Sequence, residues 1–382
     1  MPFGDDFLLD PAVAFLNHGS FGACPIPVLE AQDELRRELE REPVAFLARS
    51  LDDRLAAVRR GLASYIGAAD PDAIVLSGSV THGLNAVAAS VPLEPGDEIL
   101  MTAHEYPSTI TMWREIATRA GARAVVVPPA WPAVRGDTVA RLESAVTSRT
   151  RVVFCSHVTS ETATLLPVED VVQIAHRAGA ISIVDGAHAP GHIPVDVDSI
   201  GADVYAVNAH KWLCAPKGSA FLHVAQTAQE WVRPLVITSR WNDSVPTSFQ
   251  ARFSWPGTYD PTPALSIPAA VEYQAERDWG RVRRGCADLG RATVAEIEQR
   301  GLGRRCTPEE LTPPQMVAFS VAHPDPHRLQ AELWDEYRIE IPAWPVDGVA
   351  TVRLSVQAYT SEEHCERLID ALAALLGRAG NC

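Results

Sequence analysis

The sequence predicts an α/β protein in which a large domain with a mostly parallel sheet precedes a smaller α+β domain. Short apolar runs alternate with helical stretches over residues 73–207, as in a parallel sheet covered on both faces. From about Leu265 the pattern changes to a long helical region, then strands, then a closing helix. With 382 residues, 47% of them hydrophobic, the chain is large enough for two domains.

The elements before the alternating region are short. Phe15–Gly22 is expected to form a short strand that runs into a polar, glycine-rich turn. Amphipathic helices are expected from about Pro27 to Arg41 and from about Leu51 to Tyr65, because apolar residues recur there at helical spacing.

Six apolar runs are expected to form the buried strands of the sheet. Ligands of such sheets bind outside the carboxyl ends of the strands, and the polar motifs discussed below follow these runs. The runs are Ala73–Leu76, Glu98–Met101, Ala124–Val127, Arg151–Cys155, Ile181–Val184 and Val204–Val207.

The second half of the chain begins with an interruption of this periodicity. Ser239–Pro263 is rich in Trp, Ser, Pro and Asn and predicts a long ordered loop. Strands are expected near Met316–Val321 and Val349–Leu354, and a helix over Glu362–Leu376 closes the chain.

Charge and composition exclude several classes of function. The net charge of −15 disfavours nucleic acid or an anionic membrane surface as the main partner. No apolar stretch approaches a membrane span, and the first residues do not form a signal peptide, so a cytoplasmic protein is expected. The seven cysteines are scattered without CxxC spacing and no HExxH occurs, so no metal site is expected.

Only two lysines occur, Lys211 and Lys217, although Lys and Arg together number 33. Where arginine supplies the ordinary surface charge, a retained lysine suggests chemistry that guanidinium cannot perform, such as Schiff-base formation. Lys211 follows a strand end and is the favoured candidate; a surface lysine beside a core Trp is the alternative. Lys217 follows Pro216 in a turn and is expected to be structural or electrostatic.

A Schiff-base lysine points to pyridoxal phosphate (PLP), which also needs an acid at its ring nitrogen and an anion site for its phosphate. Asp185 ends the apolar run Ile181–Val184, and its carboxylate could keep the pyridine nitrogen protonated. A helix N-cap or turn is the alternative role. The spacing to Lys211 favours the cofactor.

Three further motifs could complete the site. Ser77–Gly83 lies between a strand and a helix, where free N–H groups and hydroxyls bind anions, although many βα turns look alike. His104–Pro107 could stack an aromatic ring on the cofactor, or be a capping loop. Arg353 is a charge inside an apolar strand, explained either by a substrate carboxylate or by a structural ion pair.

The motifs Val184–Gly191 and Asn208–Gly218 resemble the class V aminotransferase-like family of fold-type I PLP enzymes. The likeness extends from Leu16 to Arg353 and is greatest to the isopenicillin N epimerase-like branch. It implies a mostly parallel seven-stranded sheet covered by helices, with a smaller α+β C-terminal domain. The implied segments are an N-terminal segment near the active site (1–25), a large PLP-binding domain (26–264) and a small domain (265–382).

The resemblance also implies roles for individual residues. Lys211, Asp185, Tyr106 and His188 would be catalytic. The cofactor would contact these four residues together with Ser79, Val80, Thr81, His104, Asn208, His210, Gly257 and Thr258. Gly257–Thr258 would reach the phosphate of a neighbouring subunit, which implies a homodimer with shared sites. An amino-acid substrate would meet Asn17, His18, Tyr259 and, through its carboxylate, Arg353.

Two departures bear on the reaction. The stretch Arg338–Trp344 has no cysteine where cysteine desulfurases of this class carry their nucleophile, which disfavours persulfide formation. Tyr259 stands where many epimerase-like members carry Arg, which weakens recognition of a second substrate carboxylate.

The expected chemistry starts when the substrate amine displaces Lys211 to give an external aldimine and the freed lysine removes the Cα proton. The favoured outcome is β-elimination from a cysteine S-conjugate in secondary metabolism, a C–S lyase reaction. Epimerisation needs an acid on the opposite face, either Tyr106 or a water, and is the main alternative. Decarboxylation or deamination, transamination and a non-catalytic PLP-fold scaffold or sensor are the others.

Overall fold

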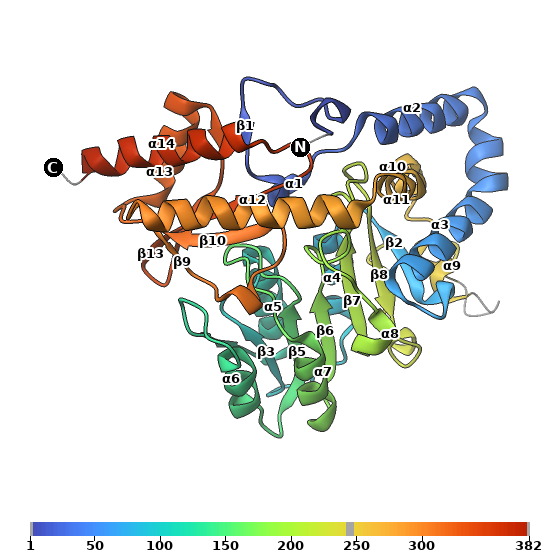
Figure 1. The fold of residues 1–382 in the computed structure, drawn as a ribbon. Helices are drawn as coiled ribbons and strands as arrows, with labels where there is room; N and C mark the ends of the chain where they lie inside the picture. Colours follow the sequence, from blue (N-terminus) through green and yellow to red (C-terminus); the bar gives the residue numbers. More distant parts are fainter. Residues whose placement is uncertain (1–2, 242–247, 380–382) are drawn as a thin grey trace.

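The computed structural model describes residues 3–241 and 248–379, and its main feature is a seven-stranded sheet (Figure 1). The strand order is β2-β8-β7-β6-β5-β3-β4. β8 pairs antiparallel with both β2 and β7, while the other neighbours run parallel. The strands are β2 (Ile74–Ser77), β3 (Glu98–Thr102), β4 (Arg123–Val127), β5 (Thr150–Ser156), β6 (Ile181–Asp185), β7 (Val204–Asn208) and β8 (Ala220–Val224).

Both faces of this sheet are buried, which explains why its strands are continuous apolar runs. In β5, Val152 and Phe154 join the core beneath α4 and α5, whereas Val153 and Cys155 join the core beneath α6 and α7. The helices of this part are α3 (Leu51–Ile66), α4 (Val80–Ser90), α5 (Pro107–Ala120), α6 (Asp137–Ala145), α7 (Val168–Arg177), α8 (Val197–Ile200), α9 (Phe249–Phe253), α10 (Thr262–Leu265) and α11 (Ile267–Glu276).

A four-stranded antiparallel sheet, β12-β13-β10-β9, forms the smaller α+β part. In Figure 1 the long orange helix α12 crosses the molecule from α11 to this sheet. The elements are α12 (Trp279–Gln299), β9 (Arg304–Arg305), β10 (Met316–Ser320), α13 (Pro326–Tyr337), β11 (Ile339–Glu340), β12 (Ala343–Val346), β13 (Val349–Ser355) and α14 (Glu362–Ala379).

The N-terminal segment packs against the C-terminal part rather than continuing the large sheet. β1 (Ala14–Phe15) pairs with β11, and Asn17 forms a parallel bridge with Ser355 of β13. Two helices follow, α1 (His18–Phe21) and α2 (Ile26–Arg41). The first residues of the chain thus meet a strand that lies more than 300 positions later, and Figure 1 shows this blue segment beside the orange and red elements.

The expected fold class is confirmed, and the six expected strands of the large sheet are all present. The seventh strand, β8, was not identified from the sequence, and neither were the short strands β9, β11 and β12. The long ordered loop expected over Ser239–Pro263 contains α9 and the start of α10. Residues 242–247 of that stretch lie outside the described part. The limits of the three expected segments stay predictions.

Candidate active site

The carboxyl ends of the parallel strands bring polar side chains to one edge of the large sheet. Ser77 ends β2, Thr102 ends β3, Ser156 ends β5, Asp185 ends β6 and Asn208 ends β7. Because these strands point the same way, residues separated by up to 131 positions in sequence meet at a common edge. The motifs singled out from the sequence therefore converge where ligands of this fold class bind.

Lys211 lies just beyond the end of β7, and its side chain meets His188. Lys211 Nζ is 2.9 Å from His188 Nε2. Burial lowers the pKa of Lys211 to about 7, with Asp185 raising it and Arg353 lowering it further. A large fraction of Lys211 is therefore an uncharged amine near neutral pH, as a nucleophile or base must be.

One carboxylate oxygen of Asp185 accepts a hydrogen bond within the described chain, and the other is available to a ligand. Its Oδ1 accepts a hydrogen bond from the Ala187 N–H at 2.9 Å, which is the turn role considered above. Its Oδ2 accepts no hydrogen bond from any residue within 3–241 and 248–379. Burial raises the pKa of this carboxyl, while Lys211 lowers it. A buried carboxylate with one open oxygen fits the protonated pyridine nitrogen of PLP.

The residues around the N-terminus of α4, Ser77–Gly83, form the candidate anion-binding loop. Asn208 Oδ1 accepts a hydrogen bond from the Val80 N–H at 2.9 Å, and Ser79 Oγ caps the helix through the His82 N–H at 3.1 Å. The N–H groups of Gly78, Ser79 and Thr81 donate to no other residue of the described chain. These free donors at the positive end of a helix fit a phosphate.

His210 directly precedes Lys211 in sequence and is partly buried. Its Nδ1 donates a hydrogen bond to the Ser219 carbonyl oxygen at 3.2 Å, which leaves Nε2 without a described partner. Burial, reinforced by the charge of Lys211, lowers the pKa of His210 to about 4. His210 is therefore neutral at physiological pH, and Nε2 is an acceptor.

Arg353 is a buried cation held by neutral groups. Its Nη1 donates to the Ser160 carbonyl oxygen at 2.7 Å, and its Nη2 donates to Asn17 Oδ1 at 3.0 Å and Ser20 Oγ at 2.9 Å. No ion pair joins it to a carboxylate of the described residues, so the structural ion pair considered above is not found there. The Arg353 Nε is buried without a partner. Burial lowers the pKa of Arg353, while the negative charge of Glu161 raises it without forming a direct ion pair. A buried arginine with no direct carboxylate partner suits a carboxylate ligand.

His18 is placed differently from its expected role. It is fully buried, with Nε2 3.0 Å from the Lys211 carbonyl oxygen and Nδ1 2.9 Å from the Tyr359 hydroxyl. Both ring nitrogens are thus engaged within the protein, and His18 supports the backbone of Lys211. Asn17, the neighbouring residue, is the one whose side chain reaches Arg353.

The two aromatic candidates of the loop before α5 have different surroundings. Tyr106 is the N-cap residue of α5 and remains 42% exposed, so its ring is accessible. His104 instead lies against the small domain, with Nε2 3.6 Å from Asp347 Oδ2 and its ring edge on Trp131. The structure thus leaves Tyr106, and not His104, with a free ring.

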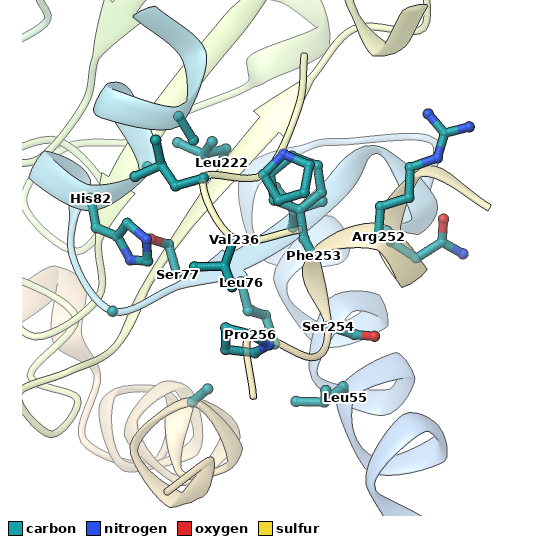
Figure 2. A pocket seen from close by; sticks show the side chains of 18 of the residues that line it. Leu55, Leu76, Ser77, His82, Leu222, Val236, Arg252, Phe253, Ser254 and Pro256 are labelled. Carbon is teal, nitrogen blue, oxygen red and sulfur yellow. The ribbon is translucent and has the colours of Figure 1, made fainter. Parts of the chain in front are cut away.

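Gly257, Thr258 and Tyr259 are not joined to Lys211 or the anion-binding loop by hydrogen bonds in this single chain. Thr258 is exposed, and Tyr259 donates to the Ser254 carbonyl oxygen at 3.4 Å. Tyr259 also lines a mostly apolar cavity of about 260 Å³. Figure 2 shows this cavity from close by. The labelled wall residues of this cavity are Leu55, Leu76, Ser77, His82, Leu222, Val236, Arg252, Phe253, Ser254 and Pro256, so the cavity borders the anion-binding loop but does not include Lys211.

Several residues with contacts in the site were not singled out from the sequence. Glu105 is buried and accepts hydrogen bonds from Thr102 Oγ1 at 2.6 Å and from the Ser156 N–H at 2.8 Å. Ser20 and Ser160 hold Arg353. A carboxylate directly before a candidate stacking tyrosine was the only local signal for Glu105, and none existed for the two serines.

No helix among residues 3–241 and 248–379 has both the length and the apolar character needed to cross a membrane. The same residues contain no group of three or more His, Cys, Asp and Glu side chains arranged to hold a metal ion.

Comparison with known proteins identifies similar enzymes over nearly the whole chain. The isopenicillin N epimerase of Streptomyces clavuligerus is 35% identical, covering 97% of this chain and 96% of that enzyme. The L-cysteine desulfhydrase of Arabidopsis thaliana is 27% identical, covering 97% and 89%.

Among solved structures, the apo cysteine desulfurase of Thermococcus onnurineus NA1 superposes with a TM-score of 0.85 at 24% identity. The match covers 98% of this chain and 97% of that one, and it shows the shared fold. The Aminotransferase class-V family model matches residues 25–368, which confirms the expected resemblance and the expected cofactor. The chain therefore belongs to the class-V aminotransferase family of PLP-dependent enzymes.

Proposed function

We propose that this enzyme is a carbon–sulfur lyase that acts on a cysteine S-conjugate. The reaction breaks the Cα–H and Cβ–S bonds, consumes one water and releases a thiol, pyruvate and ammonia. PLP, when bound, supplies the electron sink for the pair left behind by the Cα proton. Lys211 removes that proton and delivers one to the departing sulfur, since the base and the acid of an elimination can be the same group.

The observation that carries this proposal is the set of proton-carrying groups around Lys211. Lys211 Nζ is hydrogen-bonded to His188, and His188 is hydrogen-bonded to one further side chain of the described residues, Trp212. An indole donates a hydrogen bond without ionising, so it cannot act as a second acid. Elimination needs only the acid–base group Lys211, whereas epimerisation needs a second one on the opposite face of the substrate, where Tyr106 is the candidate side chain.

The other residues have supporting roles in the proposal. Asp185 keeps the ring nitrogen protonated through its open Oδ2. Arg353 binds the substrate carboxylate, with Asn17 and Ser20 orienting its guanidinium. Tyr106 covers one face of the ring. The phosphate contacts come from Ser79, Val80, Thr81, Asn208 and His210, of which the first three belong to the α4 N-terminus.

Amino-acid epimerisation is the second candidate, because the 35% identity to an isopenicillin N epimerase extends over nearly the whole chain. It requires Tyr106 or a bound water to protonate Cα from the face opposite Lys211. Tyr259, in the place of an arginine, weakens this candidate for substrates with a second carboxylate.

Proton NMR in heavy water distinguishes these functions. The enzyme is mixed with L-amino acids and cysteine S-conjugates, with Lys211→Ala as the control. Pyruvate with a stoichiometric thiol supports the lyase. Deuterium at Cα together with racemisation, and no fragmentation, replaces it by the epimerase. Carbon dioxide release or a keto acid that retains the substrate side chain identifies decarboxylation or transamination.

We also propose that the active protein is a homodimer in which Gly257–Thr258 of one subunit contacts the phosphate in the other. Support comes from the exposure of Thr258 and from the absence of hydrogen bonds between Thr258 and the other described residues. In sedimentation experiments the protein should be a dimer, and Thr258→Glu should lower PLP affinity because a carboxylate repels the phosphate. A monomer that retains full PLP affinity contradicts the proposal.

A further inference from the structure

The indole of Trp212 lies among buried rings next to Lys211. It is 0% exposed and stacks on His192 with ring centroids 4.1 Å apart and an interplanar angle of 20°. Its other neighbour is His18, at a centroid distance of 4.9 Å. Its Nε1 donates a hydrogen bond to His188 Nδ1 at 3.1 Å. Trp212 therefore contacts the imidazole that is hydrogen-bonded to the amine of Lys211.

This hydrogen bond determines which nitrogen of His188 carries the proton. An indole N–H can only donate, so Nδ1 of His188 must be the acceptor. A neutral imidazole has one acceptor and one N–H, so the proton is on Nε2. A cationic imidazole would direct its Nδ1–H at the indole N–H, so the two donors would repel each other. Burial also lowers the pKa of His188 well below its usual value. His188 is therefore neutral.

The protonation state of Lys211 follows from that of His188. The 2.9 Å contact joins His188 Nε2 to Lys211 Nζ, and Nε2 is the donor. An ammonium group has three donors and no acceptor, whereas a neutral amine has a lone pair. Lys211 Nζ must therefore accept the hydrogen bond as a neutral amine.

We propose that Trp212 is a positioning residue whose indole N–H fixes the Nε2–H tautomer of His188, which in turn holds Lys211 as the neutral amine that captures the cofactor aldehyde. The proposal rests on the proposed role of Lys211 as the cofactor lysine. It is independent of the choice between lyase and epimerase, because capture of the cofactor precedes either reaction.

The other rings beside Trp212 are held neutral in the same way. The Gln315 N–H donates to His192 Nε2 at 2.8 Å, so His192 Nδ1 carries the proton and donates to the His188 carbonyl oxygen at 2.9 Å. His18 donates through Nε2 to the Lys211 carbonyl oxygen. The rings that contact the indole therefore bring no positive charge towards Lys211.

Other charged groups also act on Lys211 and must be separated from the effect of Trp212. Asp185, from β6, favours the ammonium form, and Arg353, from β13, disfavours it. His210, the preceding residue, is held neutral by its own burial and by the charge of Lys211. Substitution of Trp212 leaves these three groups in place, so a change in the titration of Lys211 reports on the His188 tautomer.

The two-lysine composition allows a test without catalysis. The full-length apoprotein is acetylated with a trace of acetic anhydride at a series of pH values, and peptide mass spectrometry quantifies modification of Lys211 and of the exposed Lys217. Only the neutral amine reacts, so each midpoint reports one lysine. The wild-type midpoint for Lys211 should lie near pH 7, and Lys217 provides the internal reference.

Trp212→Phe should raise the midpoint for Lys211 by about one pH unit, the order expected for one lost hydrogen bond. Without the indole N–H, His188 can place its proton on Nδ1 and accept from the Lys211 ammonium through Nε2, which stabilises the cation. Trp113→Phe is the matched control, because Trp113 is also 0% exposed but its Nε1 has no hydrogen-bond partner. This control should leave the midpoint unchanged.

A second replacement separates the N–H from the shape of the ring. β-(3-Benzothienyl)alanine at position 212 keeps the bicyclic ring and has sulfur in place of the N–H, so it should raise the midpoint as Trp212→Phe does. The rate of PLP capture by the apoprotein, followed by visible absorbance, should show the same shift with an unchanged plateau at high pH.

An unchanged Lys211 midpoint in both Trp212 variants overturns the proposal. A lower high-pH plateau in the rate of PLP capture, without a shift in midpoint, also overturns it, because that result indicates a packing role only. Failure of the proposed role of Lys211 as the cofactor lysine gives a different result. Borohydride reduction of the wild-type protein with PLP would then leave Lys211 unmodified in the peptide map.

Discussion

Arg353 Nη2 lies 3.0 Å from the amide oxygen of Asn17, a residue 336 positions earlier in the chain. The N-terminal segment reaches it because Asn17 bridges to Ser355 and because the Ser355 N–H donates to the Leu16 carbonyl oxygen at 2.9 Å. This contact supplies a neutral acceptor for one guanidinium nitrogen, so the cation is oriented without losing its charge to a carboxylate. The site is thus built from the two ends of the chain.

Arg353→Lys should raise KM for amino-acid substrates by about 10- to 100-fold, because a lysine cannot form the paired hydrogen bonds to a carboxylate and one charge-assisted bond is worth about 1.5–3 kcal/mol. The change in kcat should be smaller. Steady-state kinetics measure both constants. Arg119→Lys, on the exposed face of α5, is the control and should leave KM unchanged. A lower kcat with an unchanged KM would contradict carboxylate binding by Arg353.

Lys211→Ala should abolish the visible absorbance of the lysine-bound cofactor, because no other described amine reaches His188. The matched control is Lys217→Ala, which should retain the band because Lys217 is exposed and follows Pro216 in a turn. Absorption spectra of the two purified proteins provide the measurement. A band that persists in Lys211→Ala and disappears in Lys217→Ala would exchange the two assignments.

Glu105→Gln should change the pH dependence of stability. Burial raises the pKa of Glu105 to about 7 against an ordinary value of 4.5. Between these values the folded state binds more protons than the unfolded state, so stability falls as pH rises from about 4.5 to 7 and then levels off. The shift corresponds to on the order of 3 kcal/mol.

The variant should lack this part of the decline, because a glutamine does not ionise. Its Oε1 can accept from the Ser156 N–H, and its Nε2 can donate to Thr102 Oγ1. Urea unfolding of the apoprotein at pH 5 and pH 8 gives the comparison. Glu115→Gln, an exposed carboxylate on α5, should retain the wild-type slope. Identical slopes for wild type and Glu105→Gln would mean that Glu105 is ionised throughout this range.

Gly22→Ala should destabilise the protein and loosen the cofactor. Gly22 has a φ of +67°, and a Cβ there would meet the His210 carbonyl oxygen inside contact distance. Gly136, with a φ of +72° and nothing within 4 Å of its Cβ position, is the matched control. Gly136→Ala carries only the left-handed penalty of about 1–2 kcal/mol.

The difference between the two thermal unfolding midpoints isolates the contact between Gly22 and His210. Gly22→Ala should have the lower midpoint and should release PLP faster, because His210 precedes Lys211, the proposed cofactor lysine. Equal midpoints would show that the N-terminal segment moves aside without cost.

Much of the site follows from local pattern. Each expected strand of the large sheet is an apolar run that ends at or just before a polar residue, and parallel strands bring their carboxyl ends to one edge. Asp185, Asn208, Lys211 and the loop before α4 could therefore be placed together from the sequence alone. Lysine scarcity marked Lys211, and the family likeness supplied the cofactor.

Other features depend on contacts that no local pattern encodes. β8 was missed although it is a fully buried run of the same length as β6 and β7. Its antiparallel place between β2 and β7 is decided by tertiary packing. The contact of the buried Glu105 with Ser156 links the loop after β3 to the end of β5, and His104 lies 3.6 Å from Asp347 in the hairpin between β12 and β13.

The sequence by itself determined the fold class and the family and singled out the candidate for the reactive lysine, because these depend on residue type and on periodicity along the chain. Tertiary structure alone decided the states of those groups. His188 becomes a neutral Nε2–H tautomer because Trp212 points its N–H at Nδ1, and Arg353 keeps its charge available because Asn17 and Ser20 are neutral. Protonation and orientation depend on what lies within about 3 Å in space, and neighbours in space are set by the packing of distant segments.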